Sequence, residues 1–88
     1  MANKRDLKKD INYVLGDIIE AVYMWELDNT DKPTKESDAI IDDAINTFDE
    51  LIAQVNARDV EDKKAHFKSI HTTLESKGKE LIERINKL

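Results

Sequence analysis

The sequence has no cysteine, one proline and two glycines, and its aromatic residues are one tryptophan, two tyrosines and two phenylalanines. Without cysteine, disulfide scaffolds, Cys-ligated zinc, iron–sulfur clusters and thiol catalysis are excluded. So few glycine, proline and aromatic residues argue against β-sandwiches, β-barrels and glycine-rich phosphate loops. No apolar run approaches the roughly 18 residues of a membrane span, and the charged opening 1–10 does not resemble a signal peptide. We therefore expect a soluble helical protein of the cytoplasm.

What is present is enough apolar material for one core. The chain has 88 residues, of which 40% are hydrophobic and 38% are charged, with a formal net charge of −5. A chain of this size buries only about 60–65% of its unfolded surface. We expect a single domain over residues 1–88 that gains stability from a partner.

Apolar residues recur at steps of three and four in three segments, which is the spacing of amphipathic helices. The pattern predicts helices over about residues 4–27, 35–57 and 60–88. Asn3, either Thr34 or Ser37, and Asp59 are the candidate N-caps. Gly78 lies on the apolar face of the last segment, where it either lets another helix approach closely or divides the segment into two helices. We favour a continuous helix because no loop residues follow it.

Connections of about seven and about three residues make neighbouring helices antiparallel. The predicted fold is therefore an all-α, up-down-up antiparallel three-helix bundle, with four helices as the alternative if the chain breaks at Gly78. The residues expected in the core are Leu7, Ile11, Val14, Ile18, Trp25, Ile41, Ile45, Phe48, Ile52, Val55, Phe67, Ile70, Leu74, Leu81 and Ile85.

Charge is unevenly distributed along the chain. Residues 1–10 carry four basic and two acidic side chains, whereas residues 11–34 carry one basic and five acidic ones. Residues 35–56 have one basic and six acidic side chains, and their helix has a candidate acidic surface formed by Asp42, Asp43, Asp49 and Glu50. This surface is typical of a solvated helix face, and the alternative is a docking site for a basic partner. The acidic balance argues against direct nucleic-acid binding.

No metal, cofactor or catalytic site is indicated. His66 and His71 are five residues apart, which places them about 140° apart around a helix, so one face cannot present both to a metal. For His71, a hydrogen-bonded position at the edge of the apolar stripe competes with a ligand or acid–base role that would need Glu75 or another carboxylate. The segment 28–33 lacks the glycine and the bidentate glutamate of a calcium loop. We expect no enzymatic activity.

The most informative anomaly is the side of the first helix opposite its apolar stripe. This side carries Tyr13, Gly16, Glu20, Tyr23, Met24 and Leu27, although an exposed helix side should be mostly polar. Gly16 also costs about 1 kcal/mol relative to alanine inside a helix, which calls for a packing reason. Three explanations stay open: a protein partner or second copy covers this side, the connection after residue 27 folds back over it, or its apolar residues are simply exposed.

The opening from Asn3 to Val14, with the sequence NKRDLKKDINYV, resembles that of small, uncharacterised all-helical proteins from Bacteroidales-type bacteria. This resemblance implies a helical bundle of unknown function, and it implies no functional residues.

Two classes of function remain for this chain. The first is a non-enzymatic protein–protein interaction module, working as a homodimer or with an unknown protein partner through the far side of the first helix, with the acidic second helix as another surface. The alternative is a small-ligand or metal-binding helical bundle that uses His71 and nearby carboxylates.

Overall fold

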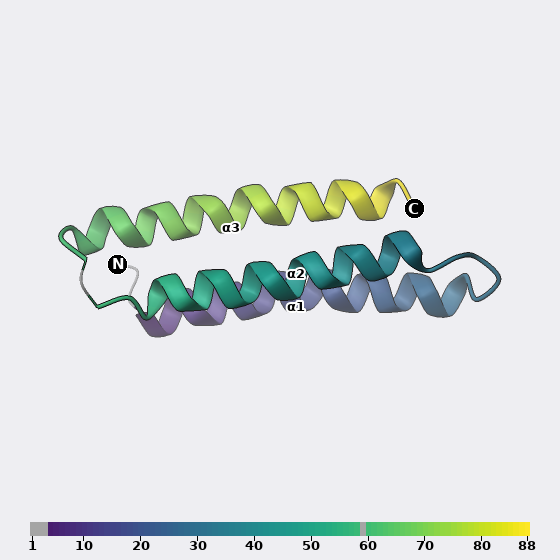
Figure 1. Cartoon of the computed structure of the whole chain (residues 1–88), viewed down its shortest axis with the longest axis horizontal. Helices are drawn as coiled ribbons and strands as arrows, with labels where there is room; N and C mark the ends of the chain where they lie inside the picture. The colour runs from purple at the N-terminus through teal and green to yellow at the C-terminus, as the bar shows by residue number, and fades with distance from the viewer. Residues whose placement is uncertain (1–3, 59) are drawn as a thin grey trace.

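The computed structural model describes residues 4–58 and 60–88, and this part of the chain forms three α-helices and no strand. Helix α1 spans Lys4–Asp28, α2 spans Lys35–Val55 and α3 spans Lys63–Asn86. Figure 1 shows that α1 and α3 run in one direction and α2 runs in the other. Each helix packs against the other two, which confirms the predicted all-α, up-down-up antiparallel three-helix bundle.

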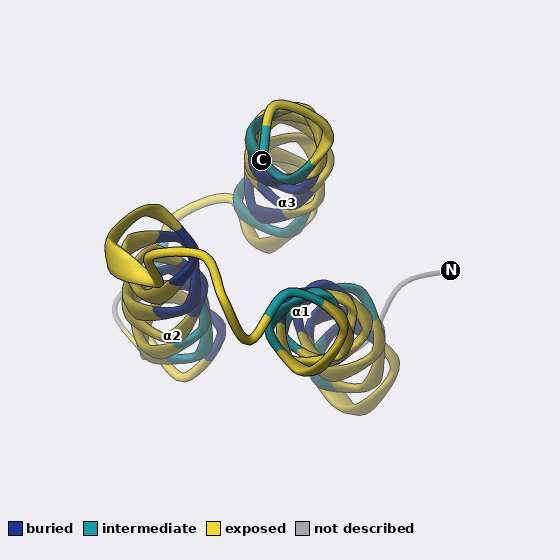
Figure 2. Ribbon diagram, turned by 90° about the vertical axis from the view of Figure 1, so that its right-hand side faces the viewer, coloured by how far each residue is buried: buried dark blue, intermediate teal, exposed yellow. Residues whose placement is uncertain are grey.

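The bundle is long and thin, with principal extents of 50, 19 and 17 Å. In the end view of Figure 2 the three helices stand at the corners of a triangle, and the buried side of each faces the shared centre. The core is entirely aliphatic, because all five aromatic side chains are exposed or only half-buried. Its members are Leu7, Ile11, Leu15, Ile18, Val22, Ile40, Ile41, Ala44, Leu51, Val55, Ile70, Leu74 and Leu81.

Helix α1 is rotated about its axis relative to our expectation. Val14 and Trp25, predicted to be core residues, are half-buried, and Ala21 from the same stripe is exposed. Leu15 and Val22 are buried instead. The apolar stripe of α1 is wider than the strip that two neighbouring helices can cover, so the positions of α2 and α3 decide which edge is buried.

The same correction applies to α2 and α3. Ile45 is 44% exposed, so its predicted place in the core is wrong. Four other predicted core residues pack against the core but remain half-buried: Phe48, Ile52, Phe67 and Ile85. In α2 the predicted core residues Ile41 and Val55 are buried, and three residues from the flank of the predicted stripe are buried with them, namely Ile40, Ala44 and Leu51.

Helix α3 continues through Gly78, so the alternative fold with four helices is wrong. Gly78 is buried, and a Cβ atom there would lie 3.2 Å from Val14 Cγ1 and 3.9 Å from Ile18 Cδ1. The missing side chain therefore lets α1 and α3 approach each other closely. Contact with α1 outweighs the low intrinsic helix preference of glycine at this position.

The second connection is longer than predicted, because α2 ends at Val55 and α3 begins only at Lys63. Asp59, the predicted cap, lies outside the described residues. Asp62 is the N-cap instead, and its carboxylate accepts a hydrogen bond from the Ala65 amide at 3.1 Å. At the start of α2, Thr34 occupies the N-cap position without a side-chain capping bond. Asn3, the cap predicted for α1, also lies outside the described residues.

A buried hydroxyl joins α1 to α2 near the first connection. Ser37 is fully buried, and its Oγ lies 2.6 Å from Glu26 Oε2 and 2.9 Å from the Thr34 carbonyl oxygen. A hydroxyl has a single proton, so these two acceptors share it. The contact draws the first turn of α2 against the end of α1 and thereby fixes how the chain reverses between them.

Candidate interaction surface

The α1 back face is the side of α1 that points away from the other two helices. We define it by the six predicted residues, all of which are exposed: Tyr13, Gly16, Glu20, Tyr23, Met24 and Leu27. The exposed fraction is 59% for Tyr13, 52% for Tyr23, 56% for Met24 and 73% for Leu27. Helical periodicity brings them together, because steps of three and four residues return to one side of the helix.

The connection between α1 and α2 does not cover this face, so the explanation in which it folds back over Tyr23 and Leu27 is wrong. The connection is held by the last turn of α1. Asn29 donates from Nδ2 to the Trp25 carbonyl oxygen at 2.9 Å, and the Lys32 amide donates to the Asn29 carbonyl oxygen at 3.0 Å. The chain then passes directly into α2. The back face is left to solvent within the described chain.

Gly16 has no packing role within the bundle. Nothing lies within 4 Å of the position that a Cβ atom would occupy there, in contrast to Gly78. The residue is exposed in the interior of α1, where glycine is less favourable than alanine by roughly 0.5–1 kcal/mol. The described fold therefore offers no compensation for this cost.

A cation lies beside the aromatic part of the α1 back face. Lys9 Nζ is 5.8 Å from the centre of the Tyr13 ring, one helical turn away. This separation lies within the range of a cation–π contact, which is weak at an exposed site. The basic first third of α1 is thus in contact with its apolar surface.

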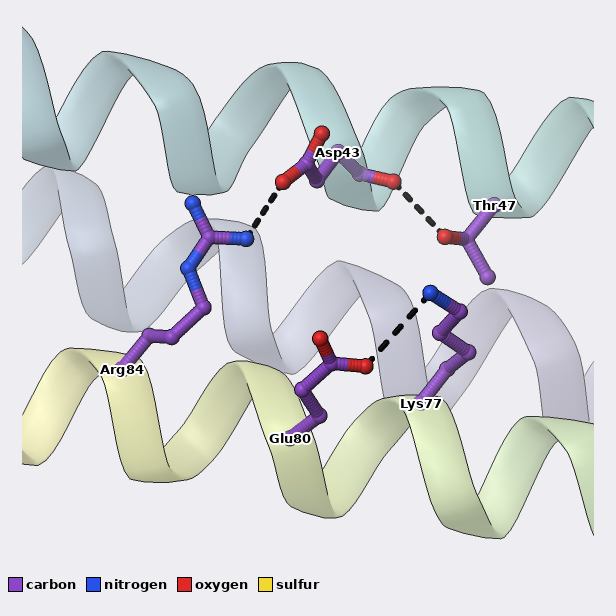
Figure 3. A network of polar contacts seen from close by, with 5 residues as sticks. All are labelled: Asp43, Thr47, Lys77, Glu80 and Arg84. Carbon is purple, nitrogen blue, oxygen red and sulfur yellow. Dashed lines mark hydrogen bonds and ion pairs between the residues drawn. The ribbon is translucent and has the colours of Figure 1, made fainter.

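The acidic surface of α2 is smaller than its sequence indicates. Asp42, Asp43, Asp49 and Glu50 are all exposed, but Asp43 Oδ2 accepts a charged hydrogen bond from Arg84 Nη1 of α3. Figure 3 shows this pair bridging the two helices, with the Lys77–Glu80 pair alongside on α3. Asp43 therefore belongs to the contact between α2 and α3, and three of the four predicted carboxylates remain as an open acidic surface.

Arg84 could not be found by inspecting α2, because it lies 41 residues from Asp43. Only the predicted antiparallel arrangement of the helices could have indicated this partner. In an antiparallel pair the first half of α2 lies beside the last turns of α3, so a cation near the end of α3 is a candidate partner.

The two histidines do not form a shared site. His66 Nε2 lies 2.6 Å from the Gln54 carbonyl oxygen and links the start of α3 to the end of α2. His71 is an exposed residue whose Nδ1 lies 3.4 Å from Glu75 Oε1, the carboxylate that the sequence suggested. Among residues 4–58 and 60–88, no three His, Asp or Glu side chains come close enough together to hold one metal ion.

Within the described residues, clefts also bring together residues that are far apart in the sequence. A cleft of about 220 Å³ at one end of the bundle is lined by Lys4, Arg58, Lys63 and Phe67, among others. A shallower groove of about 470 Å³ runs between α1 and α3, with Val14, Leu74 and Ile82 on its apolar floor. Within the described residues, no helix combines the length and apolarity needed to cross a bilayer.

No known protein family, curated protein or solved structure matches this chain. The resemblance of residues 3–14 to small bacterial helical proteins therefore stays a prediction, and the site must be interpreted from its own geometry.

Proposed function

We propose that this chain is a non-enzymatic interaction module that associates with itself through the α1 back face. The observation that carries the proposal is the presence of four large apolar side chains on that face, each more than half exposed. Tyr23, Met24 and Leu27 lie together near the end of α1, and Gly16 and Glu20 separate them from Tyr13. Contiguous apolar patches on a protein surface mark interaction sites more often than scattered apolar residues do. Tyrosine and methionine are also enriched in protein interfaces.

The size of the patch sets the expected strength of association. The four side chains expose on the order of 500 Å², which is less than the roughly 800 Å² per partner of a standard stable interface. The surrounding polar residues must supply the rest of the contact. We therefore expect reversible association in the micromolar range, which depends on protein concentration.

The acidic α2 surface is the second element of this proposal. Asp42, Asp49 and Glu50 point away from the core and stay available for a basic partner, while Asp43 is engaged by Arg84. A surface of this kind increases the rate of encounter with a basic partner more than the affinity. We keep the cytoplasm as the expected location, which rests on the sequence alone.

Light-scattering mass across protein concentrations from about 1 µM to about 1 mM tests the proposal. We expect the wild-type mass to rise from that of one chain toward that of two. Tyr23→Glu buries a charge in the interface and should weaken association by about tenfold or more. Its fold should be unchanged, because Tyr23 is outside the core.

Ile82→Glu is the matched control. Ile82 is 50% exposed, close to the 52% of Tyr23, but it lies on α3 and lines the groove between α1 and α3. The control should associate as the wild type does. If Ile82→Glu dissociates the chains and Tyr23→Glu does not, the interface lies at the groove between α1 and α3 and not at the α1 back face. A wild-type chain that stays single at every concentration would show that the module does not self-associate.

A further inference from the structure

The cleft at one end of the bundle is lined by positively charged residues from three separate parts of the chain. Lys4 begins α1, Arg58 lies in the connection between α2 and α3, and Lys63 begins α3. The other described residues of the lining are Ala57, Val60, His66 and Phe67. No carboxylate belongs to the lining within the part of the chain that the structure describes.

The topology of the bundle brings these cations together. Helices α1 and α3 run in the same direction, so both begin at the end of the rod where the cleft lies, as Figure 1 shows. The backbone amide groups at the start of a helix carry a partial positive charge, which adds to the potential of the side chains. Side chains and backbone together therefore favour a negatively charged group in the cleft.

The three cations are not neutralised within residues 4–58 and 60–88. The side chains of Lys4, Arg58 and Lys63 take part in no ion pair or hydrogen bond there. Asp62 precedes Lys63, but its carboxylate accepts a hydrogen bond from the Ala65 amide and does not line the cleft. Like charges around one cleft repel each other, and a bound anion would relieve this repulsion.

The wall of the cleft also has an apolar part. Val60 and Phe67 are half-buried, and Phe67 packs against the core. The centre of the Phe67 ring lies 5.9 Å from that of the His66 ring, and His66 Nε2 is 2.6 Å from the Gln54 carbonyl oxygen. This contact holds His66 between the end of α2 and the start of α3. The aromatic part of the wall is therefore positioned by the fold.

The volume of the cleft limits the size of a ligand. It is about 220 Å³, whereas a cavity of about 150 Å³ accommodates benzene. One ring or a short alkyl chain with a small charged group therefore fits. A phosphate monoester carries about −1.5 to −2 charges near pH 7, which matches three cations better than the single charge of a carboxylate. Arginine also binds phosphate oxygens through two parallel hydrogen bonds.

We propose that this cleft binds a small phosphate monoester. The phosphate group contacts Lys4, Arg58 and Lys63, and the apolar group of the ligand lies against Val60 and Phe67. The site is independent of the self-association proposed above, because none of the six residues of the α1 back face lines the cleft.

Titration with phenyl phosphate at constant ionic strength, followed by two-dimensional NMR, tests the proposal on the wild-type chain. We expect saturable shifts of the backbone amides of residues 4, 57–58 and 63–67, with a dissociation constant of about 0.1–1 mM. Inorganic phosphate lacks the apolar group and benzyl alcohol lacks the charge, so each should bind at least about tenfold more weakly.

Lys63→Gln and Lys68→Gln form a matched pair of variants. Both remove one positive charge from an exposed residue of α3, but only Lys63 lines the cleft. Lys63→Gln should weaken binding of phenyl phosphate by about tenfold or more, because it removes a charged hydrogen bond. Lys68→Gln should weaken it by about twofold or less, because salt screens distant charges. Arg58→Gln is a second test and should act as Lys63→Gln does. Circular dichroism checks that each variant keeps the helical fold.

Each result supports or overturns the proposal. Binding that is weakened by Lys63→Gln and Arg58→Gln but not by Lys68→Gln supports the site. Equal weakening by Lys63→Gln and Lys68→Gln would show diffuse attraction to positive charge and overturn it. Inorganic phosphate bound as tightly as phenyl phosphate would overturn the assignment of a monoester, and no saturation by about 10 mM phenyl phosphate would overturn the site altogether. The mass measurement decides self-association separately.

Discussion

At the scale of single residues, the two glycines have opposite environments. Gly16 faces open space, and Gly78 faces Val14 Cγ1 at a distance of 3.2 Å from the position of a Cβ atom. Both occur in helix interiors, so alanine offers the same intrinsic gain at each, roughly 0.5–1 kcal/mol. Only at Gly78 does the added methyl group press against another helix. Comparing alanine substitutions at the two glycines therefore separates the effect of helix preference on stability from the effect of packing between helices.

We predict that Gly16→Ala raises the free energy of unfolding of the single chain by about 0.5–1 kcal/mol. Gly78→Ala should yield no such gain, and should be at least about 1 kcal/mol less stable than Gly16→Ala. Urea unfolding at low protein concentration, where association does not contribute, measures both values. Equal stabilisation by the two substitutions would mean that the contact of α1 with α3 at Gly78 relaxes at no cost.

At the scale of elements, Asp62 sets where α3 begins. Its carboxylate accepts the Ala65 amide proton, which otherwise has no partner within the first turn of the helix. Asp62→Ala should lower the free energy of unfolding by about 1 kcal/mol, and Asp62→Asn should retain most of the stability because asparagine caps as well as aspartate. Thermal unfolding of the three proteins tests this. A loss of the same size in Asp62→Asn would show that the negative charge matters rather than the hydrogen bond.

The sequence predicted the secondary-structure elements better than it predicted how they pack. Three stripes at helical spacing predicted three helices in the right order, because periodicity depends on local geometry alone. The rotation of α1 could not be predicted: Val14 and Leu15 both belong to its wide apolar stripe, and only the placement of α2 and α3 decides between them. The start of α3 was missed for a similar reason, since Asp59 and Asp62 are both suitable caps in the sequence.

The candidate site was only partly predictable. The composition of the α1 back face follows from spacing, and each of its residues is exposed in the single chain. Of the three explanations left open by the sequence, cover by a partner and simple exposure both remain. The pairing of Asp43 with Arg84 depends on the contact between α2 and α3, and the sequence of α2 contains no trace of it. The sequence also could not show that the connection between α1 and α2 leaves the α1 back face uncovered. That outcome depends on the hydrogen bonds of Asn29, Lys32 and Ser37, which hold the connection against the ends of the two helices.

At the scale of the whole molecule, the rod shape determines how the dimer would diffuse and scatter. The bundle is 50 Å long and less than 20 Å across. Two copies associated side by side through the α1 back face would thicken the rod without lengthening it. Small-angle X-ray scattering should therefore show a maximum dimension near that of the single chain and a larger cross-sectional radius of gyration. An end-to-end assembly would give the reverse, with the length nearly doubled and the cross-section unchanged.

The same geometry has a consequence for whatever is joined to the chain ends. The described chain starts and finishes at opposite ends of the rod, as Figure 1 shows for the beginning of α1 and the end of α3. A side-by-side pair whose two copies run in opposite directions would present, at each tip of the rod, the start of one copy and the finish of the other. The two tips would then be chemically identical, so the assembly would work as a symmetric spacer with no polarity along its length.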